Sequence, residues 1–189
     1  MRHIPNLLTC ARLLLVPCFL LASMREAYTI AFVLFLTAAL TDILDGMLAR
    51  RLNVRSRIGA LLDPAADKTL MVCGFLYYTF ARDLPVLAIP GWMTFAVFIR
   101  DFLIVLTAYL MYTRVRIKRF PPSIAGKTST VLQAGTLATV VAVNSFLPGL
   151  ELFAKILFRI TLLITLYSGW DYMRRAMRLL QDDATIAQA

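Results

Sequence analysis

Hydrophobic residues run along the chain in six long stretches, and the segments between them hold most of the charged and turn-forming residues. The apolar lengths and the intervening prolines and glycines predict six helices, over residues 4–23, 28–51, 58–81, 88–113, 124–147 and 150–178. Each stretch has the ~20 residues that a helix needs to cross a bilayer. We therefore expect an all-α integral membrane protein with six transmembrane helices, organised as a single domain over residues 1–189.

Composition agrees with lipid as the surrounding medium. Hydrophobic residues make up 60% of the 189 residues, and the mean hydropathy is +0.73. A soluble domain of this size could not cover so much apolar surface with polar side chains. The net charge of +9 does not indicate a nucleic-acid partner, because the basic residues gather at the ends of hydrophobic stretches rather than on one face of a soluble fold.

The distribution of basic residues predicts the topology. Arginines and lysines concentrate between the second and third helices, between the fourth and fifth, and after the sixth: Arg50, Arg51, Arg55, Arg57, Arg114, Arg116, Lys118, Arg119, Arg174, Arg175 and Arg178. Connections rich in positive charge stay on the cytoplasmic side of a membrane. We expect a multi-pass protein of the cell (inner) membrane, with both termini and the active site facing the cytoplasm.

Four aspartates stand in or beside the second and third predicted helices. Asp42 and Asp45 are three residues apart and Asp63 and Asp67 are four apart, so each pair shares one face of its helix. Both pairs lie near the cytoplasmic ends of consecutive antiparallel helices, where the two faces can meet. Four carboxylates at low dielectric need cations. Oxygen ligands without a neighbouring histidine or cysteine favour magnesium or manganese.

Small and basic residues share this segment. Gly46, Ala49 and Gly59 leave space for a ligand to approach the backbone, and close helix packing is the competing interpretation. Arg50 lies one turn beyond Asp45 and suits a diphosphate oxygen, with a contact to a lipid headgroup as the alternative. Taken alone, the intramembrane acids are also compatible with interhelical polar contacts or with the proton relay of a membrane carrier.

The complete pattern resembles the signature of the CDP-alcohol phosphotransferase family. It reads Asp-x2-Asp-Gly-x2-Ala-Arg-x8-Gly-x3-Asp-x3-Asp from Asp42 to Asp67. Three further segments resemble the branch that contains phosphatidylglycerophosphate synthases and cardiolipin synthases: residues 4–9 with Arg12, Arg100-Asp101, and residues 126–130 with Gln133. The resemblance implies a transferase that moves a phosphatidyl group from CDP-diacylglycerol to a glycerol-based alcohol and releases CMP. A proton-coupled carrier is the rival of another class, and no internal repeat supports it.

The resemblance also implies roles for individual residues. It implies that three aspartates bind two divalent cations, Mg²⁺ or Mn²⁺: Asp42, Asp45 and Asp63. It implies that Asp67 is the general base for the acceptor hydroxyl. It assigns the nucleotide site to four residues: Gly46, Ala49, Arg50 and Gly59. A homodimer is implied by the resemblance alone.

The acceptor is expected to contact Arg100 and Lys127. Phosphatidylglycerophosphate synthases usually carry glutamate where this chain has Asp101 and a second lysine where it has Ser129. Glycerol 3-phosphate brings a nearly dianionic phosphate that needs several cationic donors. Phosphatidylglycerol brings one phosphodiester charge, for which Arg100 and Lys127 suffice. We therefore expect phosphatidylglycerol as the acceptor, which makes cardiolipin, with glycerol 3-phosphate as the alternative.

Overall fold

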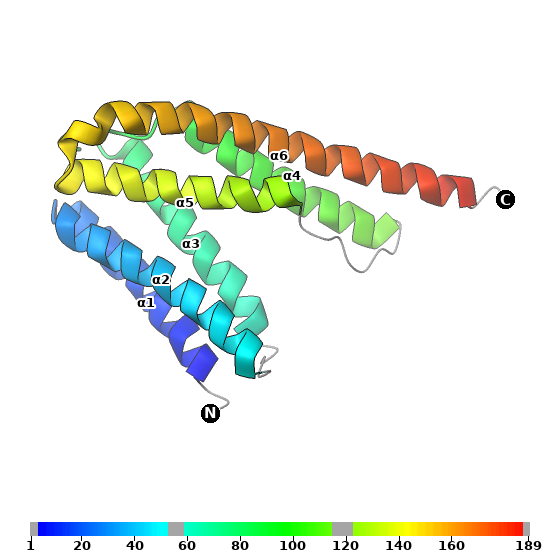
Figure 1. The fold of residues 1–189 in the computed structure, drawn as a ribbon, viewed down its shortest axis with the longest axis horizontal. Helices are drawn as coiled ribbons and strands as arrows, with labels where there is room; N and C mark the ends of the chain where they lie inside the picture. The colour runs from blue at the N-terminus through cyan, green and yellow to red at the C-terminus, as the bar shows by residue number, and fades with distance from the viewer. Residues whose placement is uncertain (1–3, 53–58, 115–122, 187–189) are drawn as a thin grey trace. The chain divides into compact units, whose positions relative to one another are not determined.

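The computed structural model describes residues 4–52, 59–114 and 123–186, and these residues form six α-helices and a short 3₁₀ turn (Figure 1). The elements are α1 (Ile4–Met24), α2 (Tyr28–Leu52), α3 (Gly59–Phe80), α4 (Gly91–Arg114), α5 (Ile124–Ser145), η1 (Pro148–Leu150) and α6 (Glu151–Ile186). No β-strand occurs among the described residues. The all-helical prediction and the six helices are confirmed. For five of the six helices, both observed ends lie within about three residues of the predicted ends.

The sixth helix is longer than the hydrophobic pattern predicts. It has 36 residues and runs to Ile186, whereas the pattern places its end at 178. At 1.5 Å per residue α6 is about 54 Å long, which exceeds the ~30 Å hydrocarbon core. No glycine or proline follows Arg178. The helix therefore continues beyond the end of its apolar stretch.

The chain divides into two compact units. The first unit contains Met1–Ile89 and Leu137–Ala154, and the second contains Pro90–Thr136 and Lys155–Ala189. Both α5 and α6 contribute to each unit.

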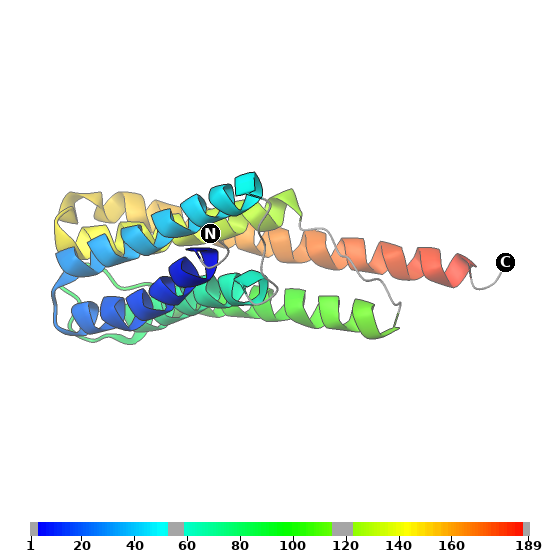
Figure 2. The same ribbon diagram turned by 90° about the horizontal axis from the view of Figure 1, so that it is seen from below.

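In the first unit, α1 packs against α2 and α3 (Figure 2). Phe19 of α1 is fully buried, and its ring centroid lies 5.9 Å from that of Phe35 and 6.3 Å from that of Tyr78. Tyr77 donates a hydrogen bond of 2.6 Å to the carbonyl of Ser23, and the Ser23 and Tyr78 hydroxyls share one of 3.2 Å. Aromatic packing and satisfied hydroxyls thus hold the three helices together.

A short turn joins α1 to α2. The Ala27 N–H donates to the Ala22 carbonyl at 2.9 Å and the Glu26 N–H donates to the Ser23 carbonyl at 3.1 Å. Glu26 has φ of 59°, the left-handed conformation that this pair of bonds requires. The turn satisfies carbonyls at the end of α1 and reverses the chain within a few residues.

The buried side chain of Asn144, on α5, anchors the irregular segment between α3 and α4. Its Oδ1 accepts hydrogen bonds from the N–H groups of Val86 and Leu87 at 3.0 and 3.1 Å. Its Nδ2 donates to the carbonyls of Leu87 and Val140, both at 2.8 Å. These bonds account for the start of α4 at Gly91 rather than at residue 88, since the preceding backbone pairs with α5.

In the second unit, α5 and α6 meet along a seam of buried polar side chains. The Ser129 and Thr165 hydroxyls lie 3.1 Å apart, and Gln133 Nε2 donates to both, at 3.1 and 3.2 Å. One turn further, the Thr136 and Thr161 hydroxyls are 2.8 Å apart. Small and hydroxyl-bearing residues are typical of helix interfaces in membranes, where they allow close approach and hydrogen bonding.

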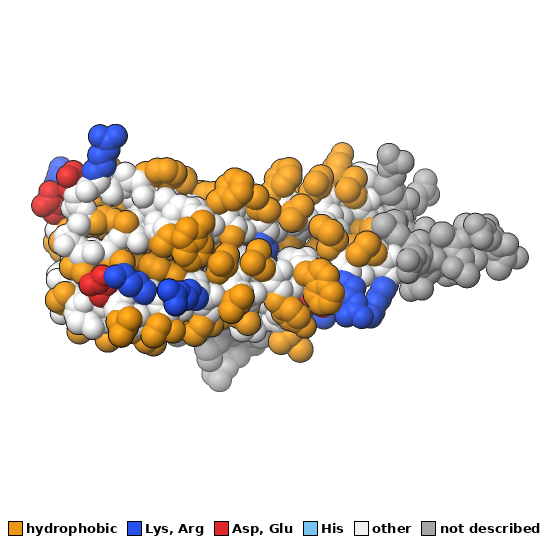
Figure 3. All heavy atoms as spheres, turned by 90° about the horizontal axis from the view of Figure 1, so that it is seen from above, with side chains coloured by type: hydrophobic (Ala, Val, Ile, Leu, Met, Phe, Trp, Pro, Cys, Tyr) orange, Lys and Arg blue, Asp and Glu red, His pale blue; other side chains and the backbone are white. Residues whose placement is uncertain are grey.

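The outer faces of the helices are apolar. Figure 3 shows hydrophobic side chains spread over the visible face, and Phe80 of α3 is 73% exposed. Other exposed apolar side chains occur on α1, α4, α5 and α6: Leu14, Phe95, Val105, Val131 and Leu163. Such surfaces indicate contact with lipid or partners. Within the described residues, one helical segment, Gly91–Met111, meets a combined criterion of length and hydropathy for crossing a membrane, with mean hydropathy 1.8.

Candidate active site

The predicted metal and nucleotide residues occupy helical positions. Asp42, Asp45, Gly46, Ala49 and Arg50 lie within α2. Gly59 is the first residue of α3, and Asp63 and Asp67 follow in its first three turns. The four aspartates therefore lie at helical positions, as predicted, and the sharing of one face by each pair stays a prediction.

The side chains from residue 42 to residue 67 lie outside the described part of the structure. The meeting of the two aspartate pairs stays a prediction for this reason. Among the side chains that are described, no three of the His, Cys, Asp and Glu residues gather closely enough to hold a metal ion, and the four aspartates are not in that set. The chemistry of the donor set fits a hard cation such as Mg²⁺ or Mn²⁺, since it consists of carboxylates.

In the part of α2 that precedes Asp42, the threonine hydroxyls donate hydrogen bonds to backbone carbonyls of the same helix. Thr37 donates a hydrogen bond of 2.7 Å to the Val33 carbonyl, and Thr41 donates one to the Thr37 carbonyl. Threonines bonded back to the preceding turn need no partner outside the helix. This stretch can consequently run through an apolar environment up to the first aspartate.

Arg100 of α4 forms the best-defined part of the site. It is only 7% exposed. Its Nε and Nη2 donate to Ser168 Oγ of α6 at 3.3 and 2.8 Å, and Nη2 also donates to the Gly126 carbonyl of α5 at 3.3 Å. Nη1 forms an ion pair with Asp101 at 2.9 Å. The buried guanidinium is thus bonded to three helices, as a desolvated cation requires.

The first turn of α5 is shaped to receive this guanidinium. A Cβ atom at Gly126 would lie 3.2 Å from Arg100 Nη2 and 3.2 Å from Ser123 Oγ, which is closer than most real contacts of that atom. Ser123 Oγ accepts a hydrogen bond of 2.9 Å from the Gly126 N–H and so caps the helix. Glycine at 126 therefore permits the approach of Arg100 to the helix.

The structure brings the two predicted acceptor residues into one neighbourhood. Lys127 follows Gly126 directly, and its N–H donates to the Ser123 carbonyl at 3.1 Å. The Lys127 side chain is exposed, whereas the Arg100 side chain is buried. Arg100 is therefore a fixed, partly neutralised cation, and Lys127 is the more accessible of the two.

Sequence reasoning missed Ser168, which accepts two hydrogen bonds from Arg100. A weak signal was present, because Thr161, Thr165 and Ser168 recur at spacings of four and three along the last apolar stretch. That spacing predicts a polar stripe on a hydrophobic helix. It does not predict which distant residue the stripe contacts.

Comparison with known proteins decides the family. The model of the CDP-alcohol phosphatidyltransferase family matches residues 2–167, which include all four aspartates and both acceptor candidates. The chain belongs to this family.

Relatives of this CDP-alcohol phosphatidyltransferase act in phospholipid synthesis. It is 32% identical to a CDP-diacylglycerol–glycerol-3-phosphate 3-phosphatidyltransferase of Aquifex aeolicus, over 94% of this chain and 98% of the relative. It is 32% identical to a probable phosphatidylglycerophosphate synthase of Mycobacterium tuberculosis, over 93% and 82%. It is 30% identical to a CMP-forming cardiolipin synthase of Homo sapiens, over 95% and 64%.

Membership in this family identifies the chain as an enzyme rather than a proton-coupled carrier. CDP-alcohol phosphatidyltransferases are membrane-embedded enzymes that generally depend on divalent metal. The apolar outer faces of the helices agree with that setting.

Proposed function

We propose that this enzyme transfers the phosphatidyl group of CDP-diacylglycerol to a glycerol-based alcohol. The acceptor hydroxyl oxygen forms a bond to the phosphorus that carries diacylglycerol, the bond from that phosphorus to the bridging oxygen breaks, and CMP leaves. The observation that supports this most directly is the unbroken aspartate pattern at helical positions of α2 and α3, in a chain of this family.

The residue roles follow the same proposal. Two divalent cations, Mg²⁺ or Mn²⁺, would be held by Asp42, Asp45 and Asp63. Bound there, they would offset the charge of the diphosphate and the charge that develops on CMP. Asp67 takes the proton of the acceptor hydroxyl. The nucleotide would be accommodated by Gly46, Ala49, Arg50 and Gly59.

We propose phosphatidylglycerol as the acceptor, so that the product is cardiolipin. The ion pair between Arg100 and Asp101 supports this choice, because it leaves little net positive charge at that position. Nε and Nη2 of Arg100 already donate to Ser168 and to the Gly126 carbonyl. A nearly dianionic phosphate needs several cationic donors, whereas a phosphodiester carries one charge and can be bound with Lys127 as the main accessible cation.

Glycerol 3-phosphate is the second candidate. It is supported by the Aquifex aeolicus relative, which is named for that acceptor and is covered over 98% of its length. A side-by-side comparison of kcat/KM separates the two candidates. We expect phosphatidylglycerol to be preferred, and a preference of about tenfold or more for glycerol 3-phosphate, or ~1.4 kcal/mol in transition-state binding, would refute that choice.

We further propose that all six helices cross the inner membrane, that both termini and the site face the cytoplasm, and that the enzyme is a homodimer. The family match covers parts of both compact units, and we propose one catalytic domain over residues 1–189. The second half of α6 supports the orientation, because the exposed Trp170 is followed there by Arg174, Arg175 and Arg178. Aromatic residues mark the interfaces of spanning helices, and an excess of basic residues indicates the cytoplasmic one.

A further inference from the structure

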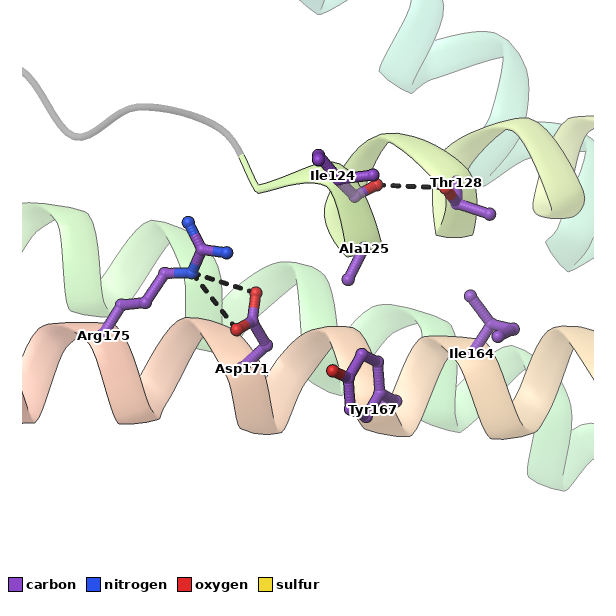
Figure 4. A pocket seen from close by; sticks show the side chains of 7 residues that line it. All are labelled: Ile124, Ala125, Thr128, Ile164, Tyr167, Asp171 and Arg175. Atoms are coloured by element: carbon purple, nitrogen blue, oxygen red, sulfur yellow. Dashed lines mark hydrogen bonds and ion pairs between the residues drawn. The ribbon is translucent and has the colours of Figure 1, made fainter.

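A pocket of about 320 Å³ lies between the first turn of α5 and one face of α6, in the second unit (Figure 4). Its lining residues are Ile124, Ala125 and Thr128 of α5 and Ile164, Tyr167, Asp171 and Arg175 of α6. None of them is among the residues assigned above to the transfer reaction. The α6 residues recur at spacings of three and four and form one stripe of the helix.

The pocket is apolar in one part and charged in another. Along α6 the lining changes from Ile164 to the Asp171 and Arg175 pair. Ile124, on the α5 side, is 82% exposed, which is unusual for a large aliphatic side chain unless lipid or a ligand covers it. A molecule that fits this pocket must itself have an apolar part and a polar part.

Asp171 and Arg175 form an ion pair in which both side chains still have groups available for hydrogen bonds to a ligand. Arg175 Nε donates a hydrogen bond of 3.2 Å to Asp171 Oδ1 and lies 3.1 Å from Oδ2, which is buried and accepts no hydrogen bond from the described residues. No other hydrogen bond to this carboxylate occurs among the described residues. In Figure 4 both dashed lines to Asp171 start from Nε of Arg175, and none starts from its two terminal nitrogens. An ionised carboxylate can accept about four hydrogen bonds and a guanidinium can donate five.

The surroundings place this pocket at the level of lipid headgroups. Tyr167 and Trp170 are exposed, with ring centroids 6.1 Å apart, and the Arg174 guanidinium lies 5.3 Å from the Trp170 ring. Exposed aromatic residues followed by arginines are typical of the level at which a helix leaves the hydrocarbon. The occupant is therefore a membrane lipid rather than a water-soluble metabolite.

We propose that this pocket binds an anionic phospholipid whose headgroup carries hydroxyl groups. The phosphate accepts hydrogen bonds from the terminal nitrogens of Arg175, the headgroup hydroxyls donate to Asp171, and the glycerol backbone and acyl chains lie against Ile164 and Ile124. Three arginines, Arg174, Arg175 and Arg178, outnumber the one aspartate between residues 170 and 178, which favours a lipid of net negative charge.

Phosphatidylglycerol is the probe that has both features, a net negative charge and headgroup hydroxyls, and three other lipids lack one or both of them. Phosphatidylcholine has neither headgroup hydroxyls nor net charge. Phosphatidylethanolamine offers an ammonium group to Asp171 but has no net charge. Phosphatidic acid is anionic but has no headgroup hydroxyl, and its extra negative charge is repelled by the carboxylate. The inference rests on the membrane crossing of α6 proposed above but not on the choice of acceptor, because it concerns binding and not transfer.

The test is native mass spectrometry of the purified full chain in detergent, titrated with each of the four lipids. We expect phosphatidylglycerol to bind most tightly. Arg175→Gln should weaken its binding about tenfold, the typical effect of losing hydrogen bonds to a charged group. Arg178→Gln is the matched control, since it removes the same charge one turn further along α6 but outside the pocket lining, and should change affinity less than about twofold.

Two more variants keep the test decisive. Asp171→Asn should narrow the preference for phosphatidylglycerol over phosphatidic acid, and its unfolding temperature shows whether the helix tolerates the change. Ala125→Leu fills the pocket from the α5 side without removing a charge and should weaken binding of phosphatidylglycerol. Equal affinities for the Arg175 and Arg178 variants, phosphatidylethanolamine binding as tight as that of phosphatidylglycerol, or no effect of Ala125→Leu would each overturn the proposal.

Discussion

At the scale of single residues, the charge state of Arg100 is the feature that bears on acceptor choice. Asp101 pairs with its guanidinium at 2.9 Å, and both side chains are largely buried. A buried ion pair is nearly neutral toward a neighbouring anion, whereas an unpaired buried guanidinium attracts it strongly. Acceptor selection at this site therefore depends on the neighbour of the arginine as well as on the arginine itself.

This dependence predicts the effect of Asp101→Asn. The substitution keeps the size of the side chain and removes its charge, so kcat/KM for glycerol 3-phosphate should rise relative to phosphatidylglycerol by about tenfold. Ser168→Ala is the comparison, because it removes a hydrogen bond to Arg100 without changing the net charge. An equal shift in selectivity in both variants would show that orientation, not charge, governs the choice.

Gly126 provides a second prediction at this scale. Gly126→Ala places a Cβ 3.2 Å from Arg100 Nη2 and should displace the guanidinium, lowering kcat/KM for the acceptor about tenfold. Gly135→Ala on the same helix is the matched control, since nothing lies within 4 Å of its added Cβ. That control should keep full activity and gain up to ~1 kcal/mol in stability. Equal activity of the two variants would contradict the proposed role of the Gly126 contact.

At the scale of elements, hydrophobic length was enough to predict the helices, while contacts between distant residues decided their details. The start of α4 depends on bonds from Asn144 to Val86 and Leu87, which are 58 and 57 residues away along the chain. The Arg100 cluster likewise joins residues 68 apart. Local patterns carry no information about such pairings. The aspartate motif was predictable because its spacing is itself local.

The segment between α3 and α4 yields a stability prediction. Asn144→Ala removes four hydrogen bonds and leaves the buried backbone N–H of Leu87 without its partner. We expect a loss of about 2–4 kcal/mol in stability, measured as a lower unfolding temperature in detergent. The activity of the molecules that remain folded should be unchanged, because none of these residues is assigned to the reaction. A variant as stable as the parent would disprove the anchoring role.

At the scale of the whole molecule, the proposed orientation has a direct test. A cysteine introduced at Ser56, between the second and third helices, should react with a water-soluble maleimide only from the cytoplasmic face. The positive charge of this connection is the physical reason. Inside-out vesicles and intact cells provide the two sides of the experiment, and labelling of intact cells from outside would overturn the topology.

The central claim is that the four aspartates perform phosphatidyl transfer, and CMP release is its most direct measure. Purified protein with CDP-diacylglycerol and a glycerol-based acceptor should release CMP only when a divalent cation is present. Asp67→Asn should lower kcat by about 10²–10⁴-fold while CDP-diacylglycerol still binds. Asp63→Asn should instead abolish turnover by weakening the binding of the divalent cations. CMP release by Asp67→Asn at the parental rate, or none from the parent with any acceptor, would contradict the account.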